Sequence, residues 1–271
     1  MSLNINSEII ESYLKDGNLN NVKNHWIYKT ITSGDYKVEE PQNICLKDFK
    51  KLFEETKKEL INFKPLNRNL WIKIFGPTPI PNNISVYLIV GAPPGYEAIV
   101  RKNNEGNRYI IIDLAQIFTY SSDIEQLDDI ILDFVTHEVA HALISLKYPY
   151  HENLTKRQLL KQITFDEGIA HFLSYQEHVL KIDWETEVMK QRKHFVYEKL
   201  NYYLTHIDEF SMSCLKKANS GPFWEKFASI AGMFAMVEYA QNGGTLETLL
   251  SDGPEVIIEH IIKNNHNFKP I

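Results

Sequence analysis

The chain has 271 residues, of which 44% are hydrophobic and 24% charged, as in ordinary globular proteins, and its formal net charge is −6. This length allows one large domain or two modest subdomains around a shared cleft. The negative net charge disfavours nucleic acids and anionic membranes as partners. No apolar run approaches the length of a membrane span, and residues 1–8 contain no basic region followed by an apolar core. We therefore expect a cytoplasmic protein.

The hydrophobic pattern changes twice along the chain. Residues 1–66 are polar and favour helices, with an amphipathic face between Leu46 and Ile61. Residues 67–118 favour a small sheet, since strand-like runs at 70–75, 84–90, 96–100 and 109–114 alternate with Gly, Pro and Asn turns. Residues 119–271 favour helices throughout. This order predicts an α+β fold, with a small antiparallel or mixed sheet before a mainly helical part, in one compact unit with a cleft.

The two cysteines, Cys45 and Cys214, lie far apart and have no C-x-x-C spacing. We expect two free, buried or partly buried thiols in a reducing compartment, with a single long-range disulfide as the alternative.

The segment from Val135 to Leu143 contains the short zinc motif H-E-x-x-H. Residues four apart share one face of a helix, so His137 and His141 can turn their imidazoles toward one metal ion. Glu138 is placed to reach a water molecule on that metal and act as a base. The other residues of the segment are uncharged, which indicates a buried helix face that a metal would satisfy. The alternative is a pair of core histidines that bond to backbone groups.

A catalytic zinc site needs a third protein ligand. The extended motif with a third histidine is excluded, because Ile144 and Lys147 stand where it requires Gly and His. The best remaining candidate is Glu167. We expect a break at Tyr148–Tyr150, then a second helix capped by Thr155 that returns beside the first. Gly168 next to Glu167 costs helix stability but allows close approach of backbone to backbone or to the site, and crowding at a metal centre explains it better than helix propensity does.

The H-E-x-x-H motif, followed by Asp166-Glu167-Gly168-x-Ala170 on a second helix, resembles the gluzincin metallopeptidases. The likeness is to the peptidase-MA-like group, related to the thermolysin and M1 families, and covers roughly residues 107–250. It implies a zincin-like fold and one Zn²⁺ per chain held by His137, His141 and Glu167, with Glu138 activating water. The Gly-x-Met-Glu-Asn segment of the M1 aminopeptidases is absent from the sequence, so an aminopeptidase activity has no support.

The resemblance also implies that an extended peptide pairs with an edge strand of the sheet. Our candidate is the strand at residues 109–114, which precedes the motif helix. Its apolar run supports a buried central strand equally well.

Family members often use a later Tyr or His to stabilise the tetrahedral anion, but Phe227, Ala228 and Ser229 stand where a Tyr would be expected. The substitutes that the preceding segment offers are Tyr197, Tyr202, Tyr203 and His206. For each of these, a packing role is the more common alternative.

Several polar side chains could support the predicted ligands. Asp166 or Asp133 could orient a ligand imidazole. His171 and His178 share a helix face with Glu167, and could form a second layer or simply hydrogen-bond at the surface. His151 and His171 are the next candidates for the third ligand if Glu167 is not one.

Together these patterns predict a zinc metallopeptidase that hydrolyses peptide bonds of peptide or protein substrates. One alternative is an inactive zincin-fold binding or scaffold protein, although all four key positions are intact. The other is a di-iron helical bundle, which needs Glu-x-x-His twice. Glu138 and His141 provide it once, whereas Glu167 and His171 are four apart.

Overall fold

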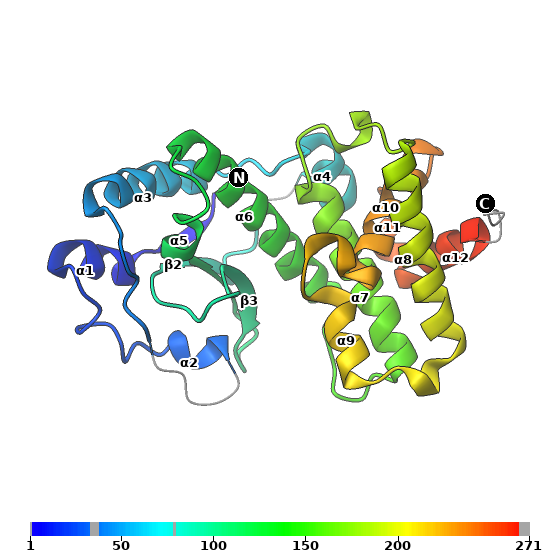
Figure 1. Cartoon of the computed structure of the whole chain (residues 1–271), viewed down its shortest axis with the longest axis horizontal. Coiled ribbons are helices and arrows are strands. Elements are labelled where there is room, and N and C mark those ends of the chain that lie inside the picture. Colours follow the sequence, from blue (N-terminus) through cyan, green and yellow to red (C-terminus); the bar gives the residue numbers. More distant parts are fainter. Residues whose placement is uncertain (1, 33–37, 78–79, 266–271) are drawn as a thin grey trace. The chain divides into compact units, whose positions relative to one another are not determined.

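The computed structural model describes residues 2–32, 38–77 and 80–265. The chain forms two compact units: residues 1–65 with 78–142, and residues 66–77 with 143–271. The described residues form many helices and one four-stranded mixed sheet, which confirms the α+β class (Figure 1). None of the described helices has the length and apolar character that crossing a membrane requires.

The sheet belongs to the first unit and has the order β1-β2-β4-β3. Its strands are β1 (Asn4–Asn6), β2 (Ile84–Ile89), β3 (Ala98–Lys102) and β4 (Arg108–Asp113). Strand β2 pairs in parallel with β1 and β4, and β3 is antiparallel to β4, so the expected mixed sheet is confirmed. The edge strand that we expected at residues 109–114 is wrong, because β4 lies between β2 and β3. Its residues Ile110, Ile111 and Ile112 are fully buried, as in a central strand.

The helices of the first unit are α1 (Glu8–Asp16), α2 (Tyr28–Ile31), α3 (Leu46–Ile61), α5 (Leu114–Ile117) and most of α6 (Ile124–Lys147). Helix α3 buries Phe49, Leu52, Phe53, Thr56 and Leu60, the three- and four-residue spacing of an amphipathic helix. This confirms the predicted face except at its two ends, Leu46 and Ile61, which are exposed.

Asp113 fixes the junction between the sheet and the helices that follow. It is fully buried, and its carboxylate accepts hydrogen bonds from the backbone N–H groups of Ala115 and Gln116 at the start of α5. It also accepts one from Ala92, after β2, at 2.5 Å. Burial raises the pKa of Asp113 to about 6, against the opposing effect of these bonds. One carboxylate thus ties together the ends of β2, β4 and α5, shortly before α6 begins.

Residues 70–75 were expected to form a strand, and this prediction is wrong. They lie in helix α4 (Arg68–Phe75), which belongs to the second unit. Trp71 and Ile74 are buried, so the core uses a three-residue spacing there and not the alternating set Leu70, Ile72 and Ile74.

The second unit is built around α7 (Lys156–Ser174) and α10 (Phe227–Gln241). Helix α10 has no charged residue from Phe227 to Val237 and buries all of them, so it is the centre of this unit. A Cβ on Gly168 would lie 2.6 Å from the Cα and carbonyl carbon of Gly232. Gly168 is therefore explained by close approach of two helix backbones, which corrects our expectation of crowding at a metal centre.

The remaining elements of the second unit surround this pair: η1 (Val179–Lys181), α8 (Glu187–Thr205), η2 (Ile207–Glu209), α9 (Met212–Asn219), η3 (Phe223–Glu225), α11 (Leu249–Asp252) and α12 (Pro254–Asn265). Cys45 and Cys214 are free, as expected, but Cys45 is exposed where a buried or partly buried thiol was expected.

Candidate metal centre

Helix α6 carries the H-E-x-x-H motif on a buried stretch. Val135, Thr136, Val139, Ala140 and Ala142 are all fully buried, so the motif lies on the apolar face that its neighbours predicted. The two histidines are half-buried, and Glu138 is only 8% exposed. Three polar groups on such a face need compensating partners.

The two imidazoles of the motif face one another. His137 Nε2 and His141 Nε2 are 2.9 Å apart, and their ring centroids are 4.5 Å apart. With Zn–N bonds of about 2.0–2.1 Å, two nitrogens on a tetrahedral zinc lie about 3.3 Å apart. The two nitrogens therefore need to move only slightly to share one ion, and neutral imidazole is a preferred ligand of zinc.

One charged side chain of the first unit, Arg101, interacts electrostatically with the motif. Burial lowers the pKa of Arg101 in β3, while the charge of Glu138 acts in the opposite direction. The Arg101 guanidinium is held by the carbonyls of Thr30 and Ile31, so it is a fixed cation near the motif. Burial, and then the charge of Asp129, raise the pKa of Asp133 to about 7, one turn before His137.

In the second unit, helix α7 begins where the sequence predicted. Thr155 caps it through a reciprocal pair of bonds with Gln158, after α6 has ended at Lys147. Glu167 and His171 lie one turn apart on α7, with Glu167 Oε2 3.6 Å from His171 Nε2. His171 and Asp166 are 6% and 5% exposed, so this turn of α7 carries buried polar side chains.

Tyr150, in the turn between α6 and α7, reaches these polar side chains. Its hydroxyl donates to Asp166 Oδ2 at 3.1 Å. Burial of the hydroxyl, together with the charges of Asp166 and Glu167, raises the pKa of Tyr150 well above its usual range. Tyr150 therefore remains a proton donor beside both carboxylates at neutral pH.

Aromatic rings cover the outer side of His171. Phe223 packs edge-on against the imidazole at 5.1 Å, and Tyr175 stacks on Phe223 at 5.4 Å. Trp224 contacts both rings, and the Arg192 guanidinium lies 3.9 Å above its indole. These contacts fix the ring plane of His171.

The end of α6 is anchored to α7 within the second unit. The Tyr148 carbonyl accepts a bond from Gln162 Nε2 at 2.7 Å, and the Tyr148 ring packs on Phe165 at 5.4 Å. The unit boundary falls directly after Ala142, the residue that follows His141. One continuous helix therefore carries both histidines and ends at the contact with α7.

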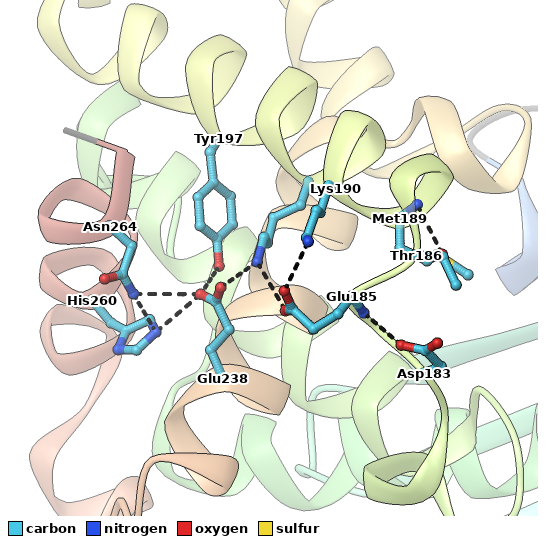
Figure 2. Close-up of polar contacts among 10 residues, drawn as sticks. Asp183, Glu185, Thr186, Met189, Lys190, Tyr197, Glu238, His260 and Asn264 are labelled. Carbon is cyan, nitrogen blue, oxygen red and sulfur yellow. Dashed lines mark hydrogen bonds and ion pairs between the residues drawn. The ribbon is translucent and has the colours of Figure 1, made fainter. Parts of the chain in front are cut away.

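Tyr197 is occupied elsewhere in the second unit. It is fully buried, and its hydroxyl donates to Glu238 Oε2 at 2.8 Å. His260 and Asn264 point to the same carboxylate (Figure 2). The distances to it are 2.6 Å from Lys193, 3.1 Å from His260 and 3.4 Å from Asn264. This group of five residues, here the Glu238 network, joins α8, α10 and α12.

The other proposed stabilising residues also have partners of their own. The Tyr202 hydroxyl donates to Glu209 Oε2, and the Tyr202 ring stacks on His206 at 4.5 Å. Cys214 Sγ lies 3.3 Å from the Tyr203 hydroxyl. These contacts support the packing role for all four candidates.

His178 does not lie on α7, so its expected shared face with Glu167 is wrong. The helix ends at Ser174, and His178 has a left-handed backbone at the start of η1. Asn67 satisfies backbone groups at the C-terminal end of α7. Its side-chain amide donates to the carbonyls of Leu173 and Gln176 and accepts from the N–H of Val179. His151 is exposed in the turn before α7.

Sequence reasoning missed Arg101 and Tyr150. A charged residue within the apolar run of β3 was a signal for Arg101. The Tyr-Pro-Tyr turn was interpreted only as a helix break, and it also brings a hydroxyl to the carboxylates of α7.

Comparison with protein-family models, with curated proteins and with solved structures finds no match to this chain.

Proposed function

We propose that the chain is a zinc-dependent metallopeptidase. In this proposal His137, His141 and Glu167 hold one Zn²⁺ per chain, and Glu138 is the catalytic base. The observation that carries the proposal is the pair of facing imidazole nitrogens, 2.9 Å apart on α6, with a buried glutamate between the two histidines in the sequence.

The chemistry of the side chains supports a third ligand from α7. His137, Glu167 and His171 are a group of described residues that could hold a metal ion. Glu167 supplies the carboxylate that completes a two-nitrogen, one-oxygen set, which is a known arrangement at catalytic zinc. His171, one turn further along α7, is the competing donor and would replace or join Glu167.

A bound zinc ion would polarise the substrate carbonyl and lower the pKa of its bound water to about 7. The part played by the chain itself lies with Glu138, which takes a proton from the attacking water and returns it to the leaving nitrogen. Tyr150 and Asp166 hold the α7 turn beside Glu167, and Phe223 holds the ring of His171.

Glu138→Gln tests the base. We expect one zinc per chain by elemental analysis, as in the unchanged protein, and a loss of peptide hydrolysis of about 10²–10⁴-fold. The substrate is a broad peptide library, read by mass spectrometry. Undiminished cleavage by the variant would remove Glu138 from the reaction.

Glu167→Ala and His171→Ala separate the two candidate ligands. We expect Glu167→Ala to weaken zinc affinity by more than about 100-fold, beyond the effect of losing an outer partner. The exposed Glu177 gives a matched control, as Glu177→Ala should change nothing. If His171→Ala alone abolished binding, the ligand on α7 would be His171.

The same measurements decide between the proposal and its alternatives. Two irons per chain would identify a di-iron protein. Bound zinc with no cleavage of any library peptide would identify a binding protein that has the zinc site but no peptidase activity.

A further inference from the structure

A cavity lies in the first unit, in a groove between α3 and α6. Its volume is about 320 Å³, within the range of small-molecule sites. One wall comes from α3 and the residues after it, including Thr56, Glu59 and Leu60, and the other from Ile131 and Leu132 of α6. The lining therefore combines three apolar side chains, Leu60, Ile131 and Leu132, with polar and charged ones.

Thr56 places a buried hydroxyl in this groove. The residue is 2% exposed, and its Oγ1 has no hydrogen-bond partner among the residues that the structure describes. A hydroxyl buried without a partner is costly, so such groups in native proteins call for an explanation. A ligand in the groove supplies one, since Thr56 can donate to it or accept from it.

Asp128 stands on the same face of α6, one turn before Ile131 and Leu132. Its Oδ1 is buried and has no hydrogen-bond partner in the described part of the chain. Burial, and then the charges of Glu59, Glu55 and Asp129, raise the pKa of Asp128 to about 6, while Lys51 acts in the opposite direction. Asp128 is not itself a lining residue, but it interacts electrostatically with Glu59, which is one.

We propose that this groove binds a small molecule that carries an ammonium group on an apolar body. The ammonium group, which has donors only, would meet Asp128, Glu59 and the Thr56 hydroxyl, and the apolar body would lie on Leu60, Ile131 and Leu132. A bare metal ion fits less well, because the described side chains close enough together to hold one are His137, Glu167 and His171, not Asp128 and Glu59. Lys58 and Lys64 also line the groove; like Glu59 they are exposed, and their flexible stems let the charges turn to solvent, so the buried Asp128 oxygen is the main anion of the site.

Calorimetric titration with isopentylamine tests the site, with isovalerate as a probe of similar shape and opposite charge. We expect saturable binding of the amine in the millimolar range or tighter, and none of the acid. Asp128→Asn should weaken amine binding about tenfold, since it removes a charge-assisted hydrogen bond. Asp129→Asn is the matched control, because Asp129 is the exposed neighbour and should leave the affinity unchanged.

Thr56→Val supplies a measurement that does not depend on the amine. Valine keeps the shape of threonine without the hydroxyl, so the Tm should stay the same or rise while amine binding weakens. A fall in Tm of several degrees would show that the hydroxyl is bonded within the protein. That result, the lack of saturable amine binding up to ~10 mM, or equal binding of isovalerate would overturn the proposal.

Discussion

Tyr150 has an exposed ring and an enclosed hydroxyl, an arrangement that explains its role at α7. The residue is 48% exposed, yet its hydroxyl donates to Asp166, the neighbour of Glu167. Hydrogen bonds to groups beside a metal ligand hold the ligand in one orientation, and their loss commonly costs 10–100-fold in metal affinity.

Tyr150→Phe should therefore weaken zinc binding by roughly tenfold while the fold is retained. Competition with a chromogenic chelator measures the affinity, and circular dichroism checks the fold. Tyr148→Phe is the matched control, because the Tyr148 hydroxyl bonds to the Leu250 carbonyl and does not touch Asp166. Equal affinity in the two variants would contradict the positioning role of Tyr150.

The sequence predicts the motif residues themselves, since the spacing of His137 and His141 requires only one helical turn. It does not predict Arg101 or Tyr150, which reach the motif and α7 through the register of β3 and the course of a turn. Their contributions depend on tertiary packing, which leaves no local periodicity.

The crossing of α7 and α10 depends on the absence of two Cβ atoms, at Gly168 and Gly232. Gly168→Ala gains up to about 1 kcal/mol of helix propensity. It also forces a Cβ to within 2.6 Å of Gly232 backbone atoms, and overpacking of this kind costs about 1–3 kcal/mol or more. We expect net destabilisation of about 2 kcal/mol in urea unfolding. Gly106→Ala is the control: a Cβ there would meet nothing within 4 Å, so this variant shows the cost of backbone conformation alone. A Gly168→Ala variant as stable as the wild type would contradict the tight crossing of α7 and α10.

The Glu238 network makes the second unit sensitive to acid. Burial alone would raise the pKa of Glu238, but the bonds from His260, Lys193 and Tyr197 and the charge of Lys193 lower it to about 2, from an ordinary 4.5. A carboxyl with a depressed pKa stabilises the fold fully above about pH 4.5, and this stabilisation is lost as the pH falls toward 2. Glu238→Gln should therefore cost on the order of 3 kcal/mol at neutral pH and flatten the acid branch of the stability curve.

Glu185 provides the control for that measurement. Its carboxylate lies 4.0 Å from Lys193 Nζ, against 2.6 Å for Glu238, but its side chain is 70% exposed against 20% for Glu238. Glu185→Gln should change the stability by less than about 1 kcal/mol, as for surface pairs. Equal effects of the two substitutions, or an unchanged acid branch in Glu238→Gln, would contradict the role of the network.

Among the elements, the helix pair that carries the motif could be predicted because its caps and breaks are local, as at Thr155 and Pro149. Strand β1 was missed because Asn4–Asn6 is short and polar, and it forms only by pairing with β2. Helix α4 was mistaken for a strand because its short apolar run fits both the two-residue alternation of a strand and the spacing of a helix. Only the burial of Trp71 and Ile74 decides between these two patterns.

At the scale of the whole molecule, a metal that binds only the folded chain stabilises it in proportion to its affinity. If the proposed ligands hold zinc, removing the zinc with a chelator should lower the Tm by several degrees in calorimetry. Restored zinc should reverse the change, and Glu167→Ala should be insensitive to the chelator. An unchanged thermogram would contradict the proposed ligand set.

Helix α6 also limits where residues can be inserted into or deleted from the chain. Each residue added between His141 and Tyr148 would turn the histidines by about 100° about the helix axis relative to the anchored Tyr148 and shift them by about 1.5 Å. The exposed turn before Thr155 could absorb the same addition without moving either end. Insertions and deletions should therefore be tolerated in that turn and excluded from the last turns of α6.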